Sequence, residues 1–372
     1  MNTDDHQYEK MINIDILLPS PTKRPIGGYK ILYEYAKRIA DNNINIRFVY
    51  VLHLPFSKDS IKKKLFNLVK LLFFNRAQYI ANWYDFGPSK SMIKHRIVYN
   101  YKLTNQKDID LIITSEVRTA IIVNPKYNLK PKISFIQGYE TWIVDELLLR
   151  KTYSNAKTYN IVISNWLREK YENIGSNIDT VIPNAIDGET FFLKKIPEER
   201  YDFSICMMYS RLPIKQSWIG LETYEKLHRI NDKIKFTAFG VYARPNIMPT
   251  WINYVHDPSE ELLLDIYNDH AIFLSTSEEE GFGLPPAEAM NCGACVVSTD
   301  SGGVRDFCIN GQTGILVNSD NSTLIAKKVM NIMVNSDERI RLAYRGYEKV
   351  NEFKWTDNVR RLKDIISKLL TP

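Results

Sequence analysis

Two glutamates, Glu280 and Glu288, stand eight residues apart across a loop rich in glycine and proline, in the run EGFGLPPAE. Gly281 and Gly283 have no side chains, so backbone N–H groups of the segment Gly281-Phe282-Gly283 can come close to a ligand. Pro285 and Pro286 suit a helix start, where free N–H groups and the helix dipole attract anions. Glu288 is then expected about half a turn or more inside that helix, with a carboxylate that can accept two hydrogen bonds from a vicinal diol. Sites for a phosphate, a diol and a further hydroxyl together describe a pocket for a sugar nucleotide.

Basic residues that could serve such a pocket occur in the segment YSRLPIKQS, directly after the apolar run Phe203 to Met208. If that run is a parallel strand, Arg211 and Lys215 lie at its carboxyl end, where α/β sheets bind ligands. A diphosphate that departs without a metal needs basic side chains and N–H donors to relieve its charge. Arg211 and Lys215 are candidates for that role, and the alternative is two solvated basic residues on a loop.

Two loops in the first half of the chain offer further candidates. Gly27-Gly28 ends the segment PSPTKRPIGG before a helical pattern, and it is either a backbone cradle for a ligand or a turn that needs positive φ. Gln137 and Glu140 lie in QGYETW, after the apolar run Ile133 to Ile136, and are polar candidates for catalysis. Glu140 is as well suited to capping a helix that begins near Trp142.

The elements that would hold these residues form two similar sets. With 372 residues and 44% hydrophobic content, the chain is long enough for two domains. Apolar runs alternate with amphipathic stretches, as in parallel sheets joined by helices. The expected strands of the first half are Ile12 to Leu18, Ile44 to Leu52, Leu111 to Thr114, Ile133 to Ile136 and Tyr159 to Ile163, and its expected helices include Tyr29 to Ile39 and Trp142 to Lys151.

The same alternation restarts after Asp187. The expected strands are Phe203 to Met208, Lys235 to Phe239, Ala271 to Leu274, Ala294 to Ser298 and Gly314 to Val317. An amphipathic helix with Asp357 as candidate N-cap runs to the end of the chain. We therefore expect an α/β protein with a Rossmann-like domain over residues 1–185, a second over 186–352, and a helical segment over 353–372.

The Glu280 to Asp300 region resembles glycosyltransferase family 4, the group 1 type of retaining glycosyltransferases, whose signature is Glu, seven residues, Glu in a GFGLP-type loop. The segment PNAID, residues 183–187, resembles the family's interdomain PNG-(V/I)-D motif, with alanine in place of the usual glycine. The resemblance implies that Glu280 holds the donor sugar and Glu288 the ribose hydroxyls. It also implies that Arg211 and Lys215 bind the donor phosphates, although Lys215 departs slightly from the usual spacing and Gln216 replaces the common glycine.

The family likeness also implies a fold and a reaction. The fold is GT-B, with two Rossmann-like domains facing a cleft and a C-terminal helix that crosses back to the first, acceptor-binding domain. The expected catalytic positions are Glu280, Arg211, Lys215, Glu140 and Gln137. The expected donor-binding positions are Gly27, Gly28, Arg211, Lys215, Glu280, Gly281, Phe282, Gly283, Leu284 and Glu288.

The implied reaction is metal-independent, retaining transfer of a hexose or deoxyhexose from a UDP-, GDP- or dTDP-sugar to a glycan or lipid-linked acceptor in bacterial surface polysaccharide synthesis. No metal or other cofactor is expected. Two rival hypotheses stay open: a sugar-nucleotide epimerase on the same fold, and a catalytically silent subunit that binds sugar nucleotides. The chain has no Gly-x-Gly-x-x-Gly turn after a strand, which argues against a dehydrogenase.

The charge balance, the N-terminal residues and one basic segment indicate which partners and which cell compartment to expect. A balance of 49 basic against 43 acidic residues is too small and dispersed to indicate nucleic-acid binding. The polar, acidic N-terminus and the lack of a long apolar run lead us to expect a cytoplasmic protein. Residues 60–76, SIKKKLFNLVKLLFFNR, read either as an interfacial helix on the anionic inner face of the cytoplasmic membrane or as a helix packed on the first domain. The four cysteines are expected to be small buried thiols without chemistry.

Overall fold

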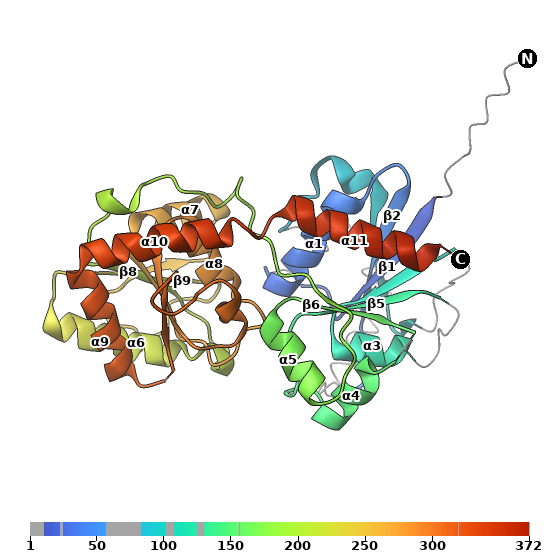
Figure 1. The fold of residues 1–372 in the computed structure, drawn as a ribbon, viewed down its shortest axis with the longest axis horizontal. Coiled ribbons are helices and arrows are strands. Elements are labelled where there is room, and N and C mark those ends of the chain that lie inside the picture. The colour runs from blue at the N-terminus through green and yellow to red at the C-terminus, as the bar shows by residue number, and fades with distance from the viewer. Residues whose placement is uncertain are drawn as a thin grey trace, which may run out of the picture. The chain divides into compact units, whose positions relative to one another are not determined.

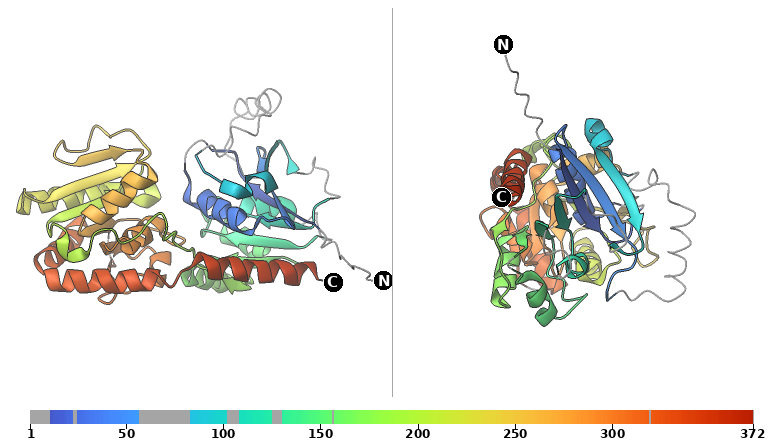
Figure 2. Two further views of the ribbon diagram at one scale, coloured as in Figure 1. Left: turned by 90° about the horizontal axis from the view of Figure 1, so that it is seen from above. Right: turned by 90° about the vertical axis from the view of Figure 1, so that its right-hand side faces the viewer.

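A computed structural model describes residues 11–22, 25–56, 83–101, 108–124, 130–155, 157–318 and 320–371. The chain divides into two compact units, each built around a parallel sheet (Figure 1). Unit 1 comprises Met1–Ile163, Arg168–Ile182 and Val359–Pro372, and unit 2 comprises Ser164–Leu167 and Pro183–Asn358. In each unit the sheet is twisted and helices pack beside it (Figure 2).

Unit 1 contains a seven-stranded parallel sheet in the described residues, in the order β3-β2-β1-β4-β5-β6-β7. Its strands are β1 (Ile12–Leu18), β2 (Ile44–Val51), β3 (Ile93–Val98), β4 (Leu111–Thr114), β5 (Lys132–Ile136), β6 (Tyr159–Val162) and β7 (Thr180–Val181). Its helices are α1 (Gly27–Ile39), α3 (Val117–Val123), α4 (Glu146–Tyr153), most of α5 (Asn165–Asn173) and the 3-10 turn η2 (Gly87–Met92).

The order of strands in this sheet reverses beside β1. From β1 the chain proceeds outward to β2 and β3 and then returns to β4 on the other side of β1, where Ile14 pairs with Leu111. Such a switch point opens a crevice at the carboxyl ends of the strands, where α/β proteins bind ligands. The loops after β1, β4 and β5 follow strands at or beside this switch point.

Unit 2 contains a six-stranded parallel sheet in the part of it that is described, in the order β10-β9-β8-β11-β12-β13. The strands are β8 (Ser204–Met208), β9 (Lys235–Gly240), β10 (Asn253–His256), β11 (Ile272–Ser275), β12 (Cys295–Thr299) and β13 (Ile315–Val317). The helices are α6 (Ser217–Ile230), α7 (Glu260–Asp269), α8 (Leu284–Asn291), α9 (Ser322–Val334), α10 (Ser336–Val350) and the turns η4 (Pro197–Glu199), η5 (Pro213–Lys215) and η6 (Gly303–Asp306). Here the switch point lies between β8 and β11.

Helix α11 (Trp355–Leu370) begins in unit 2 and continues into unit 1 from Val359. Within unit 1, Arg361 donates to the carbonyl of Val181 at 2.7 Å, and the Lys363 ammonium lies 3.0 Å from the Asp41 carboxylate. In Figure 1 the red helix α11 accordingly runs beside elements of unit 1. The predicted α/β architecture and the return of the C-terminal helix are confirmed.

All the strands listed from the sequence are present, with ends shifted by one residue at most. Their continuous apolar runs gave a clear signal because both faces of a parallel sheet are buried. Two helix starts were wrong. The helix expected from Trp142 begins at Glu146, where the Asp145 side chain caps it by accepting from the Leu148 N–H at 2.8 Å. Asp357 lies in the first turn of α11 and is not its N-cap.

No helix in the described ranges is both long and apolar enough to cross a bilayer. Residues 60–76 lie outside those ranges, so both interpretations of that segment stay predictions. All four cysteines are buried and unpaired, as expected. Burial raises the pKa of each thiol well above its usual value, which disfavours the reactive thiolate.

Candidate functional site

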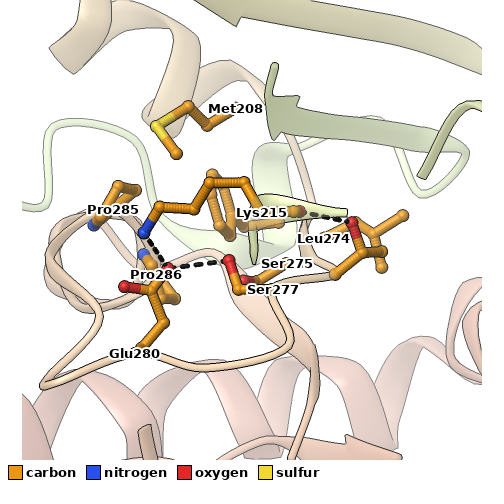
Figure 3. A pocket seen from close by; sticks show the side chains of 10 residues that line it. Met208, Lys215, Leu274, Ser275, Ser277, Glu280, Pro285 and Pro286 are labelled. Atoms are coloured by element: carbon orange, nitrogen blue, oxygen red, sulfur yellow. Dashed lines mark hydrogen bonds and ion pairs between the residues drawn. The ribbon is translucent and has the colours of Figure 1, made fainter. Parts of the chain in front are cut away.

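Lys215 and Glu280 meet at the switch point of the unit 2 sheet. The Lys215 Nζ lies 2.6 Å from Glu280 Oε1, and the Ser277 hydroxyl donates to the same oxygen at 2.7 Å (Figure 3). Lys215 ends the turn after β8, and Ser277 and Glu280 follow β11. Both side chains of the ion pair are largely shielded, with 21% and 11% exposed. In the described residues, the contacts from Lys215 and Ser277 are both made to Oε1 of Glu280. The other carboxylate oxygen, Oε2, is left to face a ligand.

Two further hydrogen bonds tie the loops that carry this pair. The Glu278 N–H donates to the Ile214 carbonyl at 2.9 Å, and the Thr276 hydroxyl donates to the Gln216 carbonyl at 3.0 Å. Gln216 itself adopts a left-handed conformation, with φ of 42° and ψ of 38°. A non-glycine residue in that region is strained, and such strain is commonly stored at functional sites.

The backbone of Glu280 is locked to the loop after β12. Its N–H donates to the Ser301 carbonyl at 2.8 Å, and its carbonyl accepts from the Gly303 N–H at 3.0 Å. A β-carbon added at Gly303 would lie 2.2 Å from the Gly281 carbonyl oxygen, so only glycine permits this approach. The backbone of the Ser301-Gly302-Gly303 segment thus holds the backbone of Glu280 in place, and Gly303 is the first residue of the 3-10 turn η6.

Glu288 lies about a full turn inside α8, at the fifth residue of the helix, in agreement with the expected half turn or more. Its Oε2 accepts a hydrogen bond from the Tyr267 hydroxyl at 3.2 Å. Burial, followed by the charge of Glu288, raises the pKa of Tyr267 well above its ordinary value, so the phenol remains a donor. The carboxylate is half-buried and is oriented from α7 by Tyr267.

The start of α8 offers fewer anion donors than its dipole alone suggests. Pro285 and Pro286 occupy the first turn and have no N–H. Gly283 is the N-cap, with φ of 98°, a conformation that favours glycine. The Phe282 side chain is buried against Phe307 and Phe353, which leaves only its backbone for a ligand. Anion binding here would therefore depend on the N–H groups of Gly281 to Leu284.

Arg211 is placed differently from Lys215. Its guanidinium lies over the Tyr242 ring, 5.1 Å from the centroid, and donates weakly to the Ala243 carbonyl at 3.4 Å. These contacts are with the loop after β9, and the side chain is exposed. The structure thus joins Lys215 to Glu280 directly, whereas Arg211 reaches neither glutamate through any contact recorded in the described residues.

In unit 1, Gly28 and Gln137 come together although they are 109 residues apart in sequence. The Gln137 side-chain amide donates to the Gly28 carbonyl at 3.2 Å, and a β-carbon at Gly28 would lie 3.2 Å from Gln137 Oε1. Neither Gly27 nor Gly28 has positive φ, so a turn requirement does not explain them. The pair begins α1, and Gly28 leaves space for Gln137.

Glu140 caps a different helix from the one expected. Its Oε2 accepts from the Val117 N–H, the first residue of α3, at 2.6 Å. The side chain is buried, and burial, followed by the charge of Glu116, raises the pKa of Glu140 to about 8. This geometry favours the capping role over the catalytic one, because the carboxyl is turned into the protein.

Ser277 and Tyr267 escaped the sequence reasoning. Ser277 stands in the polar run STSEEE, three residues before Glu280, where the sequence does not show which hydroxyl faces the carboxylate. Ser277 lines a small pocket together with Met208, Lys215, Phe273, Leu274, Ser275, Thr276, Glu280, Pro285 and Pro286 (Figure 3). The pocket places the prolines of α8 beside the ion pair.

The profile of glycosyl transferases group 1 matches residues 250–349, a range that contains both Glu280 and Glu288. Residues 250–349 are therefore similar to the group 1 glycosyl transferases, and this match does not extend to residues 1–249. An uncharacterised glycosyltransferase of Methanocaldococcus jannaschii is 20% identical over 96% of this chain and 99% of its own length. A D-inositol 3-phosphate glycosyltransferase of Corynebacterium efficiens is 30% identical, over 31% of this chain and 27% of its own length. The capsular polysaccharide biosynthesis glycosyltransferase CapM of Staphylococcus aureus is 29% identical over 29% of this chain and 27% of its own length.

Solved structures confirm the GT-B fold of this chain. Anabaena HepE, in complex with UDP and glucose, aligns with a TM-score of 0.70 at 14% identity, over 96% of this chain and all of that one. Sucrose-phosphate synthase from Thermosynechococcus elongatus aligns with a TM-score of 0.71 at 15% identity, over 96% and 99% of the two chains.

Within the described residues, no group of three or more histidine, cysteine or acidic side chains is arranged to hold a metal ion.

Proposed function

We propose that the enzyme is a retaining, metal-independent glycosyltransferase that moves a hexose or deoxyhexose from a nucleoside diphosphate to a glycan or lipid-linked acceptor in bacterial surface polysaccharide synthesis. The observation that carries this proposal is the 2.6 Å contact of Lys215 with Glu280 at the switch point between β8 and β11. A cation fixed beside a largely shielded carboxylate suits a ligand that has both a phosphate and sugar hydroxyls.

In the proposed complex, Glu280 binds a hydroxyl of the donor sugar through Oε2, while Lys215 and Ser277 hold Oε1. The Lys215 ammonium then faces the leaving phosphate, whose negative charge grows as the glycosidic bond breaks. The N–H groups of Gly281 to Leu284 supply further donors. Glu288, oriented by Tyr267, accepts from the two ribose hydroxyls.

The proposed reaction is a same-face displacement. The bond from the anomeric carbon to the phosphate oxygen breaks with its electron pair on that oxygen. The acceptor hydroxyl oxygen bonds to the same carbon on the same face and gives its proton to the leaving phosphate. Fixed charges of the enzyme stabilise this step without supplying a nucleophile.

Relatives support the choice of donor and acceptor classes. HepE was solved with UDP-glucose, and CapM is named for capsular polysaccharide biosynthesis. We extend these to the present enzyme as a UDP-, GDP- or dTDP-sugar donor and a saccharide acceptor. We place the acceptor in the first domain, residues 1–185, and the sugar nucleotide in the second, residues 186–352, with the enzyme on the cytoplasmic side of the membrane.

The test is nucleoside diphosphate release from UDP-, GDP- and dTDP-sugars, with and without a lipid-linked saccharide acceptor. Transfer predicts release that depends on the acceptor, and a product that keeps the anomeric configuration of the donor by NMR. An isomerised donor without release would instead favour an epimerase. Binding without either would favour a silent subunit.

Two parts of the proposal have separate tests. Activity that survives EDTA would support independence from metal, and activity restored only by Mg²⁺ or Mn²⁺ would contradict it. Replacing Lys62, Lys63 and Lys64 by glutamate should lower sedimentation with anionic vesicles at low salt if residues 60–76 bind a membrane surface. Unchanged sedimentation would favour a packed helix.

A further inference from the structure

Trp142 stands out in unit 1 because a rigid loop holds a largely exposed indole. Its side chain is 56% exposed, whereas large aromatic residues are usually well buried. It follows β5, which pairs with β4 on one side of the switch point between β1 and β4. No role has been given to it above, and its surroundings explain neither its exposure nor its position.

The loop from Gln137 to Trp142 is braced on three sides within unit 1. Gln137 donates to the Gly28 carbonyl at the start of α1, and Glu140 accepts from the Val117 N–H at the start of α3. The carbonyl of Gly138 accepts from the Tyr171 hydroxyl of α5 at 2.9 Å. Loops after β1, β4 and β5 are thereby joined at the edge of the sheet where ligands bind.

The glycine at position 138 fixes where the indole lies. A β-carbon added there would lie 3.1 Å from Cη2 of Trp142, a contact tight enough to displace the ring. Gly138 has no positive φ, so its backbone does not require glycine. The small residue instead allows the ring to lie against the loop with much of its surface exposed.

We propose that Trp142 is a stacking platform for a pyranose ring of the acceptor. This inference rests on the proposed function, because the donor is assigned to unit 2. A pyranose presents a face of C–H groups that packs on a flat aromatic ring, while its hydroxyls reach polar neighbours such as Gln137. The braced loop holds the indole before binding, which lowers the cost of ordering it.

The alternative ligand of Trp142 is a lipid surface. Such a surface would bind any exposed apolar side chain, whatever its shape. Leu147, in the first turn of α4, is 57% exposed and is a matched control. A lipid surface would lose affinity when either Trp142 or Leu147 is changed. A sugar ring requires the flat indole and is indifferent to Leu147.

The first experiment titrates the full chain with methyl α-D-glucopyranoside, methyl α-D-mannopyranoside and methyl α-L-rhamnopyranoside and follows saturation-transfer NMR. We expect signal on the ring C–H protons of at least one glycoside in wild type and in Leu147→Ala. The signal should be lost in Trp142→Ala, partly kept in Trp142→Phe and weakened in Gly138→Ala. Equal signals in wild type and Trp142→Ala, or none in wild type, would overturn the inference.

The second experiment measures kinetics with the lipid-linked acceptor that supports turnover. Trp142→Ala should raise the acceptor KM about tenfold, with donor KM and acceptor-independent donor hydrolysis unchanged. An unchanged acceptor KM, or a shifted donor KM, would count against the platform. If glycosides bind through Trp142 but no sugar nucleotide releases its diphosphate, the proposed function fails while the platform stands. Loss of vesicle sedimentation in both Trp142→Ala and Leu147→Ala would assign the residue to a lipid surface instead.

Discussion

The Lys215 ammonium lies 2.6 Å from Glu280 Oε1, and this contact pairs a cation from the loop after β8 with a carboxylate from the loop after β11. The two strands are neighbours in the sheet although they are far apart in sequence. The Ser277 hydroxyl also donates a hydrogen bond to the Glu280 carboxylate. Held by Ser277, the carboxylate in turn fixes the position of the Lys215 ammonium. A site with both charges already in place needs little reorganisation when negative charge develops on a leaving phosphate.

Glu280→Gln should lower kcat by about 10² to 10³-fold and leave the donor KM near that of wild type. The amide keeps the shape of the side chain but loses the charge that pairs with Lys215 and that, in the proposed complex, positions the donor sugar. Steady-state kinetics with the preferred sugar nucleotide measure both quantities. Ser277→Ala is the control and should cost much less, because Lys215 still holds Oε1. Near-normal turnover in Glu280→Gln would remove this residue from the site.

Lys215→Met should reduce kcat more than Arg211→Met, by about tenfold or more. Lys215 contacts Glu280, whereas Arg211 stacks on Tyr242 and is exposed. Matched methionine variants remove either charge and keep an unbranched side chain. The ratio of the two kcat values shows which of the two cations contributes more to turnover. Equal losses would mean that donor binding draws Arg211 away from Tyr242 to the phosphate.

Glu288→Ala should weaken nucleotide binding by about 10 to 100-fold, as expected for loss of hydrogen bonds to a charged acceptor. Isothermal calorimetry with UDP, GDP and dTDP provides the measurement. Tyr267→Phe removes the hydroxyl that orients Glu288 and should give a smaller loss. Unchanged affinity in Glu288→Ala would rule out its contact with ribose.

Much of this fold was predictable from local patterns. Runs such as Ile272–Ser275 are apolar on both faces, and buried parallel strands must be. The spacing of Glu280 and Glu288, with a Gly-Pro loop between them, was enough to choose a candidate site. The apolar runs and the glutamate spacing are both local in sequence. They can therefore be recognised in a single sequence before any tertiary contact is known.

The partners across loops could not be predicted in the same way. Glu140 precedes Trp142 and suited a cap for the next helix, yet its carboxyl accepts from Val117, 23 residues earlier. Arg211 looked a firmer phosphate ligand than Lys215, but a tight turn at Gln216 brings Lys215 to Glu280. Such pairings depend on strand order and turn geometry, which no periodicity in the sequence encodes.

Gln216→Gly should stabilise the protein by about 0.5 to 1 kcal/mol. The left-handed backbone of Gln216 is costly for a residue with a β-carbon, although glycine also loses more entropy on folding. Urea denaturation gives the free energy of unfolding. Gln216→Ala keeps the β-carbon and should show no gain. Destabilisation by glycine would mean that contacts of the Gln216 side chain outweigh the strain.

Glu140→Gln should alter the pH dependence of stability. Because the pKa of Glu140 is raised to about 8 from an ordinary value of 4.5, the folded protein holds a proton that the unfolded chain releases. Its contribution is therefore fully present at low pH and is lost as the pH rises from about 5 to about 8. Glutamine cannot ionise but can still accept from the Val117 N–H, so the variant should gain stability relative to wild type over that window.

Urea midpoints at about pH 5, 7 and 9 test this change, since each unit of pKa shift corresponds to about 1.4 kcal/mol. Glu172→Gln, whose carboxylate is 52% exposed, is the control for removing one negative charge. It should track wild type at every pH. A constant difference between Glu140→Gln and wild type would show that the carboxyl is ionised throughout. Retained glycosyl transfer in Glu140→Gln would assign the residue to bracing α3, whereas complete loss with normal stability would return it to the catalytic group.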